Sequence, residues 1–493
     1  MKFSPSKNEF DLISKKYDII AVHAKFTTDS ETPLSAYTKL SAKKPSFLFE
    51  SVVGGEQVSR YSFVGCNPKK IISCGHAETQ IFDRDAGMSS LATPNDPLQL
   101  IEEHMGDRTY HGPDLPQRFA GGAVGYLSYE YANRVEPSIP VPAEDELELP
   151  LLFFMIADSV LIFDHACQTL TISTNVSTVA DSCDSYEKAC SQIHDIWENL
   201  KKPHTLYPRQ LSEDIIPSVP EGNFTKQEFM SMVDKTKEYI RAGDIIQAVL
   251  SQRFSIPFDG EAINLYRAIR AINPSPYMFL LENDDFAIVG ASPEVHVRLT
   301  GDDVLIRPIA GTRPRGSSEE EDLKNEQDLL ADEKEKAEHL MLVDLARNDI
   351  GRVCKIGSVQ AAEFMSIERY SHVMHIVSQV IGQLDENHNA FDLMRATFPA
   401  GTVSGAPKVR AMQIISEFEN LQRNAYAGAL GYFGYDGNHD SCIAIRTAMI
   451  KNKKIHLQAG AGIVADSIPE MEYEETLNKA KGMLKAIYMA SNS

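Results

Sequence analysis

The sequence has few cysteines for a chain of 493 residues, and their spacing suggests neither a cross-link nor a zinc site. The seven cysteines lie at positions 66, 74, 167, 183, 190, 354 and 442, and no two of them form a C-x-x-C pair. An odd number of scattered cysteines is typical of a protein from a reducing compartment. We therefore expect a cytoplasmic protein without a disulfide framework.

Long apolar runs are also absent. The most apolar stretch, Leu149 to Phe163, is interrupted by Pro150 and Asp158 and is too short to cross a bilayer. The first residues, MKFSPSKNEF, contain no apolar core of a signal peptide. These features predict a protein with neither a membrane span nor a secretion signal.

The chain has fewer basic than acidic residues. The 48 Lys and Arg residues are outnumbered by 69 Asp and Glu residues, which gives a net charge of −21. This balance argues against nucleic acid or an anionic membrane surface as a partner. A site for an anionic substrate would therefore have to provide a local positive electrostatic potential in a protein that is negative as a whole.

Motifs for several common chemistries are missing. Neither G-x-x-x-x-G-K-[ST] nor G-x-G-x-x-G occurs, so nucleotide-driven chemistry is disfavoured. G-x-S-x-G and H-E-x-x-H are absent too, which disfavours serine and zinc hydrolases.

The length and the distribution of proline indicate how the chain is divided. At roughly 150 residues per domain, the chain corresponds to about three domain equivalents or two large domains. The segment 201–223 holds four prolines in 23 residues, which is typical of a linker. It would separate an N-terminal domain, 1–200, from a C-terminal domain, 224–493. Strands and helices are mixed without a regular βαβ rhythm, so we predict the α+β class.

Local patterns locate several elements. Thr225 and Glu228 form a capping box and predict a helix that begins after Thr225. Apolar runs predict one continuous strand over Leu151–Phe163 and another over Ser441–Lys451. A long helical pattern covers about 323–346.

Two pairs of glutamates repeat one helical spacing. Glu335 and Glu338 lie three apart in the long helical pattern, and Glu472 and Glu475 lie three apart in a terminal helix expected from about Pro469. Residues at i and i+3 share a helix face, so two such pairs facing a cleft would suit Mg²⁺, which prefers oxygen ligands. Taken alone, the spacing is more typical of solvated helix faces than of a metal site.

Several loops could hold an anion. Gly460–Gly462 follows an apolar strand, and its small residues would expose backbone N–H groups. The segment Phe398–Lys408 adds the hydroxyl of Thr402 and the cation of Lys408. Arg446 has apolar neighbours in a predicted strand, where an arginine usually has an anionic partner. Structural turns and a structural ion pair remain the alternative interpretations.

Six segments, in this order, resemble the chorismate-utilising enzymes, and most closely the component I chains of anthranilate synthase. They are PIAGTRPRG (308–316), EHLMLVDLARNDIGRV (338–353), FPAGTVSGAPKVRAMQII (398–415), YAGALGYFGYDG (426–437), the segment with Arg446, and QAGAGIVADSIPEMEYEET (458–476). The N-terminal half matches more weakly, through SFLFESV (46–52) and GGAVGYLSYE (121–130).

The resemblance implies a fold and a reaction. The fold would be a large mixed α/β chorismate-binding fold of antiparallel sheets flanked by helices, with an N-terminal regulatory portion. The reaction would convert chorismate and ammonia to anthranilate and pyruvate with Mg²⁺, the first step of tryptophan biosynthesis. Ammonia would come from glutamine through a separate amidotransferase subunit, in a heterotetramer, because no G-x-C-x-G nucleophile turn occurs in this chain.

The resemblance also implies site residues. Mg²⁺ would be held by Glu338 and Glu475, with Glu335 and Glu472 as their helix-mates. We expect contacts with chorismate, a dicarboxylate, from Gly311, Thr312, Lys408, Tyr426, Arg446, Gly460, Ala461 and Gly462. Glu294 would protonate the departing hydroxyl, assisted by Thr402, and its pKa should be raised by burial or by negative neighbours. His375 occupies the family's histidine position, either as a base or as a hydrogen-bonding wall residue.

Two positions bear on the product. Isochorismate- and salicylate-forming relatives have a lysine that activates water where this chain has Gln247, and glutamine cannot act as a base. Aminodeoxychorismate-forming relatives of the folate pathway typically have lysine where this chain has Ala310. Both differences favour anthranilate, and aminodeoxychorismate synthase component I is the alternative.

The family's inhibitor pocket for L-tryptophan is built from an L-x-E-S segment and an N-P-S-P-Y-M segment. Here these are Leu48–Ser51 and Asn273–Met278. The resemblance therefore implies inhibitor contacts from Ser51, Pro276, Tyr277 and Met278. The alternative is that these are only strand and turn residues.

Overall fold

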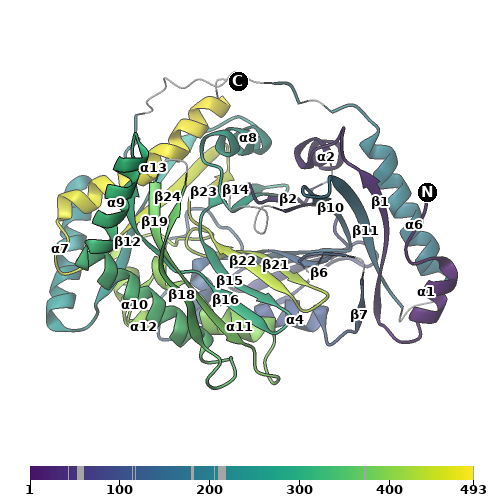
Figure 1. Cartoon of the computed structure of the whole chain (residues 1–493), viewed down its shortest axis with the longest axis horizontal. Helices are drawn as coiled ribbons and strands as arrows, with labels where there is room; N and C mark the ends of the chain where they lie inside the picture. The colour runs from purple at the N-terminus through teal and green to yellow at the C-terminus, as the bar shows by residue number, and fades with distance from the viewer. Residues whose placement is uncertain are drawn as a thin grey trace.

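The computed structural model describes residues 1–42, 44–52, 60–113, 115–116, 118–178, 182–204, 206–208, 218–370 and 373–491. Much of the predicted linker, 201–223, lies outside these residues. Two sheets form the centre of the molecule (Figure 1), and each has twelve strands in the described part of the chain.

Sheet A contains strands from both halves of the sequence. In spatial order it consists of β20 (Gly405–Ala406), β12 (Gln247–Pro257), β24 (Lys454–Ile463), β23 (Thr447–Lys451), β14 (Phe286–Ser292), β13 (Tyr277–Glu282), β2 (Ser46–Glu50), β3 (Tyr61–Cys66), β10 (Ser159–Asp164), β11 (Thr169–Ser177), β1 (Ile19–Thr27) and β7 (Tyr110–His111). Neighbouring strands run antiparallel, apart from the short parallel pair β1–β7.

Sheet B is antiparallel and is also shared between the two halves. Its order is β17 (Ile309–Pro314), β19 (Val373–Gln383), β16 (Asp303–Ile306), β15 (Val295–Thr300), β22 (His439–Ile443), β21 (Ala429–Gly434), β8 (Gly122–Leu127), β9 (Leu152–Ala157), β4 (Lys70–Cys74), β5 (Glu78–Asp83) and β6 (Gly87–Ala92), with β18 (Gln360–Arg369) paired to β19.

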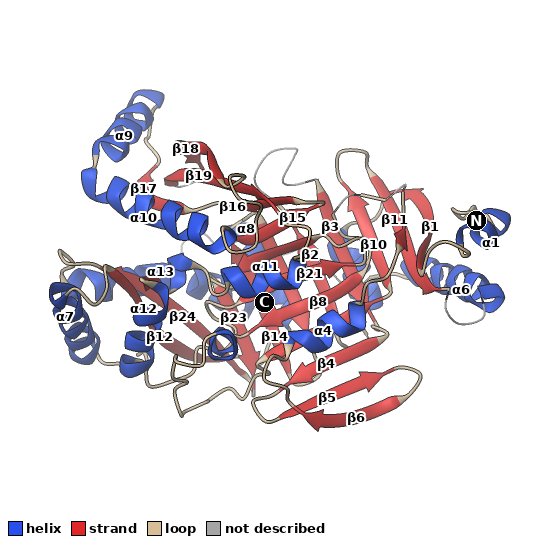
Figure 2. Ribbon diagram, turned by 90° about the horizontal axis from the view of Figure 1, so that it is seen from below, coloured by secondary structure: helices blue, strands red, loops and turns tan. Residues whose placement is uncertain are grey.

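Helices cover the outer faces of both sheets. They are α1 (Lys7–Ile13), α2 (Pro33–Leu40), α4 (Leu98–Met105), α5 (Ala132–Val135), α6 (Ser182–Leu200), α7 (Lys226–Ala242), α8 (Ala262–Ile272), α9 (Glu319–Ala331), α10 (Glu333–Ile350), α11 (Ala390–Thr397), α12 (Lys408–Phe418) and α13 (Pro469–Ser491), with 3₁₀ turns η1 (Tyr129–Tyr131) and η2 (Gly401–Val403). Helices α2, α6, α8 and α13 pack on sheet A, and α4 and α11 pack on sheet B (Figures 1 and 2). The α+β class with antiparallel sheets flanked by helices is therefore confirmed.

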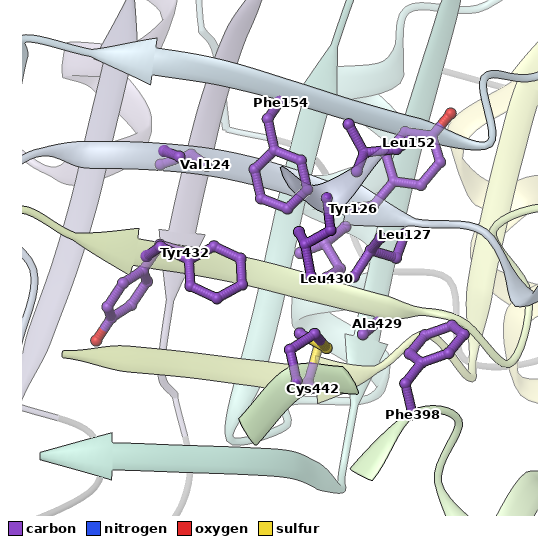
Figure 3. Close-up of a cluster of buried hydrophobic side chains, with 14 of the residues drawn as sticks. Val124, Tyr126, Leu127, Leu152, Phe154, Phe398, Ala429, Leu430, Tyr432 and Cys442 are labelled. Carbon is purple, nitrogen blue, oxygen red and sulfur yellow. The ribbon is translucent and has the colours of Figure 1, made fainter. Parts of the chain in front are cut away.

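The main core lies between the two sheets. Alternate residues of a strand face opposite sides, so Phe279 of β13 enters this core while Leu280 packs under the helices on the outer face of sheet A. Figure 3 shows part of the core, where side chains from β8, β9, β21 and β22 gather in one cluster.

Helix ends follow the local sequence signals. The Thr225–Glu228 capping box is formed, and Gly243 ends α7 in the left-handed conformation, at φ 83°. The helix expected over 323–346 is instead two helices, α9 and α10. Asp332 lies between the two helices with an extended backbone, and its carboxylate caps the N-terminus of α10.

The two long strands expected over Leu151–Phe163 and Ser441–Lys451 are each divided between the sheets. The first is β9 of sheet B and β10 of sheet A, separated by Asp158. The second is β22 of sheet B and β23 of sheet A, separated by 444–446. A continuous apolar run does not reveal a change of sheet, because residues on both sides of the change are buried.

The predicted division at 201–223 does not separate two sheets. The N-terminal strand β2 pairs with the C-terminal strand β13 in sheet A, and β8 pairs with β21 in sheet B. The halves 1–200 and 224–493 therefore share one core. No described helix has the length and apolar character needed to cross a membrane.

Candidate active site

The candidate site lies where two paired strands pass together from one sheet to the other. β14 and β23 pair in sheet A, and their continuations β15 and β22 pair in sheet B. The chain changes sheets at Glu294 and at Arg446. The Ile443 N–H donates to the Glu294 carbonyl over 3.1 Å, and the Ala291 N–H donates to the Arg446 carbonyl over 3.2 Å. These bonds hold the acid and the cation as fixed neighbours.

Glu294 is buried, with 7% of the residue exposed. Burial raises the pKa of its carboxyl to about 8, and the Thr402 hydroxyl, Lys479 and Arg446 oppose the rise. Thr402 Oγ1 faces this carboxyl, but it makes no hydrogen bond of ordinary geometry with any described group. Glu294 is therefore protonated at neutral pH and can donate a proton.

Arg446 differs from its expected setting, because it lies in the crossover with φ 50° and not in the middle of a strand. Its residue is exposed, yet the surrounding protein lowers the pKa of the guanidinium through desolvation. Within the described residues its side chain forms neither an ion pair nor a hydrogen bond. No ion pair among the described residues occupies the guanidinium, on which Glu294 acts electrostatically, so it is available to an anion.

His375 joins the two predicted substrate residues of β17. Its Nδ1 lies 2.9 Å from the Gly311 carbonyl and 3.1 Å from Thr312 Oγ1. A carbonyl can only accept, so Nδ1 carries the proton and Nε2 is left as an acceptor. Burial lowers the pKa of His375, which favours this neutral ring. Gly311 has φ 68°, which allows the bulge in β17 at this point.

The glycines expected in a loop belong to β24. The pairing of β24 with β23 covers only Lys454–Leu457, so the strand continues beyond its neighbour at Gly460 and Gly462. An added side-chain carbon at Gly460 would lie 2.9 Å from the Tyr426 hydroxyl, which places that phenol beside the strand. Ala461 faces the other way and is buried among core residues of α7 and α12, so its side chain is not a substrate contact.

Gln247 and Glu338 meet beside Gly462, which faces the same side of β24 as Gly460. Gln247 Nε2 donates to Glu338 Oε1 over 3.0 Å. Gln247 Oε1 is buried and has no hydrogen-bond partner within the described ranges. An added carbon at Gly462 would lie 2.5 Å from Gln247 Nε2, so only glycine permits this approach.

The sequence analysis missed Lys479, which connects several site residues. Its Nζ donates to the Gly460 carbonyl over 2.9 Å and lies 2.7 Å from a Glu475 carboxylate oxygen. It also acts electrostatically on Glu294. The available signal was its position four residues after Glu475 on α13, where the two side chains meet on one helix face.

The four glutamates form two pairs. Burial and Glu338 raise the pKa of Glu335, while burial and Glu475 raise the pKa of Glu472. Lys334 opposes both rises, so α10 and α13 approach each other at their N-terminal parts. No three acidic, histidine or cysteine side chains of the described residues come close enough to enclose a metal ion.

The structure does not support Lys408 as a substrate contact. Its ammonium lies 2.7 Å from Asp349 and donates to the Thr397 carbonyl over 3.2 Å. Both side chains of the ion pair are largely buried. The cation is therefore neutralised inside the protein, where an incoming anion does not reach it.

A second cavity lies between the two sheets, with about 610 Å³ of free space including its mouth. All four predicted inhibitor contacts line it: Ser51, Pro276, Tyr277 and Met278. Ser51 Oγ is buried and lacks a hydrogen-bond partner in the part of the chain that the structure describes.

Charged side chains close one side of this second cavity. Arg298 Nε donates to Asp440 over 2.9 Å, and the Tyr277 hydroxyl donates to the same carboxylate over 2.7 Å. Arg118 lies 3.3 Å from Asp440. Two arginines face one aspartate here, and Glu50, the other acidic residue that lines the cavity, is paired with Arg270, so this wall suits a carboxylate.

Comparisons with known proteins find relatives over the full length of the chain. The family model of the chorismate binding enzyme matches residues 25–485. A protein named anthranilate synthase component 1 from Aquifex aeolicus is 46% identical, over 100% of this chain and 99% of its own length. Its namesake from Acetivibrio thermocellus is 44% identical over 98% of both chains.

Solved structures are similar as well. The crystal structure of anthranilate synthase component I from Streptococcus pneumoniae superposes with a TM-score of 0.76 at 36% identity, covering 93% of this chain and 99% of that one. The menaquinone-specific isochorismate synthase from Escherichia coli shares the fold, with a TM-score of 0.68 at 17% identity over 98% of both chains.

Proposed function

The chain belongs to the chorismate binding enzyme family, and we propose that it converts chorismate and ammonia to anthranilate and pyruvate. Its full-length relatives have the name anthranilate synthase component 1. The observation that carries the proposal is the buried, protonated Glu294 beside the unpaired guanidinium of Arg446. One group can donate a proton and the other can bind a carboxylate.

Although the protein is acidic overall, the substrate would be bound by positively charged and hydroxyl groups at the site. Chorismate has two carboxylates, and the planar fork of Arg446 can bind one of them with two hydrogen bonds. Thr312 and Tyr426 offer hydroxyl groups on two sides of the site. Gly460 and Gly462 leave room for the ring against β24.

The first step replaces a hydroxyl group by an amine. Glu294 donates its proton to the C4 oxygen as the C4–O bond breaks, both ring double bonds shift by one position, and ammonia forms a bond to C2. The ammonium that results loses a proton, which restores Glu294. Water and an aminated ring that still carries its enolpyruvyl group are the products of this step.

The second step makes the ring aromatic. A base removes the C2 proton, and the enolpyruvyl group leaves and is protonated to pyruvate. His375 Nε2 is the acceptor that its neutral tautomer leaves free, which suits either a base or a hydrogen-bonding wall residue.

Magnesium fits the donor chemistry of the four glutamates. Mg²⁺ is usually held by one or two carboxylates, with water and substrate oxygens completing its shell, so a cage of three protein ligands is not required. Glu338 and Glu475 would hold it, with Glu335 and Glu472 beside them. The bound ion would neutralise these carboxylates and a substrate carboxylate.

Anthranilate is favoured over aminodeoxychorismate by the relatives' names and by Ala310, which has no amine to form an adduct with the ring. Gln247 cannot activate water as a base, so ammonia is the better nucleophile. Incubation with chorismate, Mg²⁺ and ammonium at mildly alkaline pH, followed by fluorescence and mass spectrometry, tests this. A product that retains the enolpyruvyl group would contradict anthranilate formation.

The same function suggests a partner and a location. The name component 1 suggests a second component, which would be the amidotransferase that supplies ammonia from glutamine. We place the complex in the cytoplasm, where the free thiols of the described cysteines would stay reduced. Glutamine should support turnover only when the amidotransferase is added, whereas ammonium should support turnover without it.

The cavity between the sheets suggests a second function, the binding of L-tryptophan as an inhibitor. Ser51 Oγ offers an unpaired hydrogen-bonding atom, and Arg298 and Arg118 offer positive charge for the amino-acid carboxylate. Binding that favours an inactive conformation would reduce turnover by a population shift. Calorimetric titration with tryptophan, compared with leucine, tests the preference for an indole.

A further inference from the structure

A third cavity, next to Glu294, has no role in the reaction as described above. It has about 350 Å³ of free space including its mouth, and Glu294 and Thr402 form one side. Leu342 and Ala346 of α10 also line it, as does Ala400, which precedes η2. The lining is mixed: besides Glu294 and Thr402 it includes His296, Asp349 and Thr397, and the remaining lining residues are apolar or glycine.

Two buried polar atoms of this cavity lack partners. Thr402 Oγ1 and His296 Nε2 make no hydrogen bond of ordinary geometry to any described group, although Thr402 interacts with the Glu294 carboxyl and His296 with the Thr397 backbone. His296 is 3% exposed, and its other ring nitrogen, Nδ1, lies 3.1 Å from Ser441 Oγ. An unsatisfied buried polar atom is costly unless a small molecule satisfies it, and a water needs two to four such partners.

We propose that this cavity receives the hydroxyl group that leaves C4 of the ring, as a water molecule bound by Thr402 and His296. The proposal rests on the proposed function. The leaving oxygen must be within hydrogen-bond reach of the acid that protonates it, and Glu294 is itself part of the cavity wall. The departing oxygen therefore starts its path beside this space, whereas ammonia must reach C2, two ring positions away.

The step balances without another reactant. Glu294 gives its proton to the C4 oxygen, the C4–O bond breaks with its electron pair on oxygen, and neutral water enters the cavity. The proton lost by the new C2 ammonium returns Glu294 to its acid form. Water held near Thr402 and His296 would be kept away from the cation-like ring.

Filling the cavity tests the proposal. Ala346→Leu adds bulk at a wall position that is 5% exposed, and Ala337→Leu is the matched control, since it makes the same change on the exposed face of α10. Ala400→Leu fills the space from another wall if Ala346→Leu does not fold. Circular dichroism and thermal unfolding report whether each variant is folded.

The two chemical steps are measured separately, by single turnover of chorismate with ammonium and by conversion of the isolated aminated intermediate to anthranilate. We expect the filled variant to lose at least about tenfold in the first step, because the departing oxygen would then have no space to enter; rate losses of this size are ordinary for changes at a reacting centre. The KM for ammonium and the second step should stay within about twofold of the parent and of Ala337→Leu.

Other outcomes overturn the proposal. A rise in the KM for ammonium at unchanged kcat would make the cavity an ammonia site. An equal fall in both steps would show that the cavity only maintains the shape of the active site, and no fall in a folded variant would remove its role. Failure of the parent chain to convert either substrate would instead overturn the proposed function itself.

Discussion

At the residue scale, Glu294 is buried, and the cations near it do not fully compensate for the loss of solvation of its charged form. Its carboxyl lies where the chain changes sheets, so neither solvent nor a close ion pair stabilises the charged form. The pKa of about 8 means that the acid form exists below that pH and is lost above it.

We predict that kcat falls as the pH rises through about 8, because Glu294 then loses the proton that it must donate. Glu294→Gln should reduce kcat by roughly 10²–10⁴-fold, since the amide is not an acid. Glu294→Asp keeps an acid at a shorter reach and should retain part of the activity. A Gln variant with parental kcat would remove Glu294 from the proton transfer.

The paired glutamates give a prediction about magnesium. Glu475→Gln should weaken Mg²⁺ binding in a calorimetric titration and abolish most turnover, because one of the proposed carboxylate ligands is lost. Glu474→Gln, the exposed neighbour on α13, is the matched control and should leave both quantities unchanged. Equal Mg²⁺ binding by both variants would exclude Glu475 as a ligand.

Sequence reasoning named residues that the structure brings together, but it did not give their orientation. The spacing of Glu335 and Glu338 and the capping of α7 depend on near neighbours, so they could be predicted. Whether Ala461 faces the site or the core depends on the register of β24 with β12, which brings together residues far apart in the chain. The side chain of Lys408 was misplaced for the same reason, because its partner Asp349 lies on another helix.

At the element scale, a buried ion pair joins three elements behind the site. Arg423 Nη2 donates to Glu419 over 2.6 Å and to the Val249 carbonyl of β12 over 2.6 Å, and Nη1 donates to the Val403 carbonyl of η2 over 2.8 Å. Glu419 follows α12 and accepts the Ser251 N–H over 2.8 Å. The pair therefore fixes α12 and η2 against β12.

Breaking this pair should destabilise the protein strongly. Arg423→Met leaves Glu419 buried without its cation, and the free energy of unfolding should fall by about 3–5 kcal/mol. Asp244→Asn removes the exposed partner of Arg410 and should cost at most about 1 kcal/mol. Urea unfolding of the two variants measures the difference, and equal midpoints would show that the buried pair is not needed for stability.

The strands around the second cavity give a prediction about regulation. Ser51→Ala removes the unpaired hydroxyl beside β2, so tryptophan inhibition should weaken while turnover without tryptophan stays near the parental value. Ser90→Ala on the exposed strand β6 is the control. Inhibition curves that coincide for both variants would place the inhibitor elsewhere.

At the scale of the whole molecule, both sheets take strands from both halves of the chain. Neither 1–204 nor 218–493 can complete a sheet alone, because β2 needs β13 and β21 needs β8. The sequence showed the proline-rich segment between the halves, but composition does not report which distant strands pair.

We therefore predict that the fragments 1–204 and 218–493 do not fold when each is produced alone. Produced together, they should associate and recover turnover, because β2 can pair with β13 and β8 with β21 across the break. Gel filtration and circular dichroism of each fragment, and of the mixture, check this. A folded, monomeric 218–493 fragment would show that the C-terminal half has its own core.

Because Glu294 and Arg446 lie where the chain passes from one sheet to the other, their positions depend on the distance between the two sheets. Each residue is anchored on one side to sheet A and on the other to sheet B. A remote core substitution that thickens or thins the sandwich would shift the proton donor relative to the anion-binding guanidinium. The catalytic geometry therefore depends on the packing between the sheets. Substitutions in the core are restricted by the requirements of the reaction as well as by those of stability.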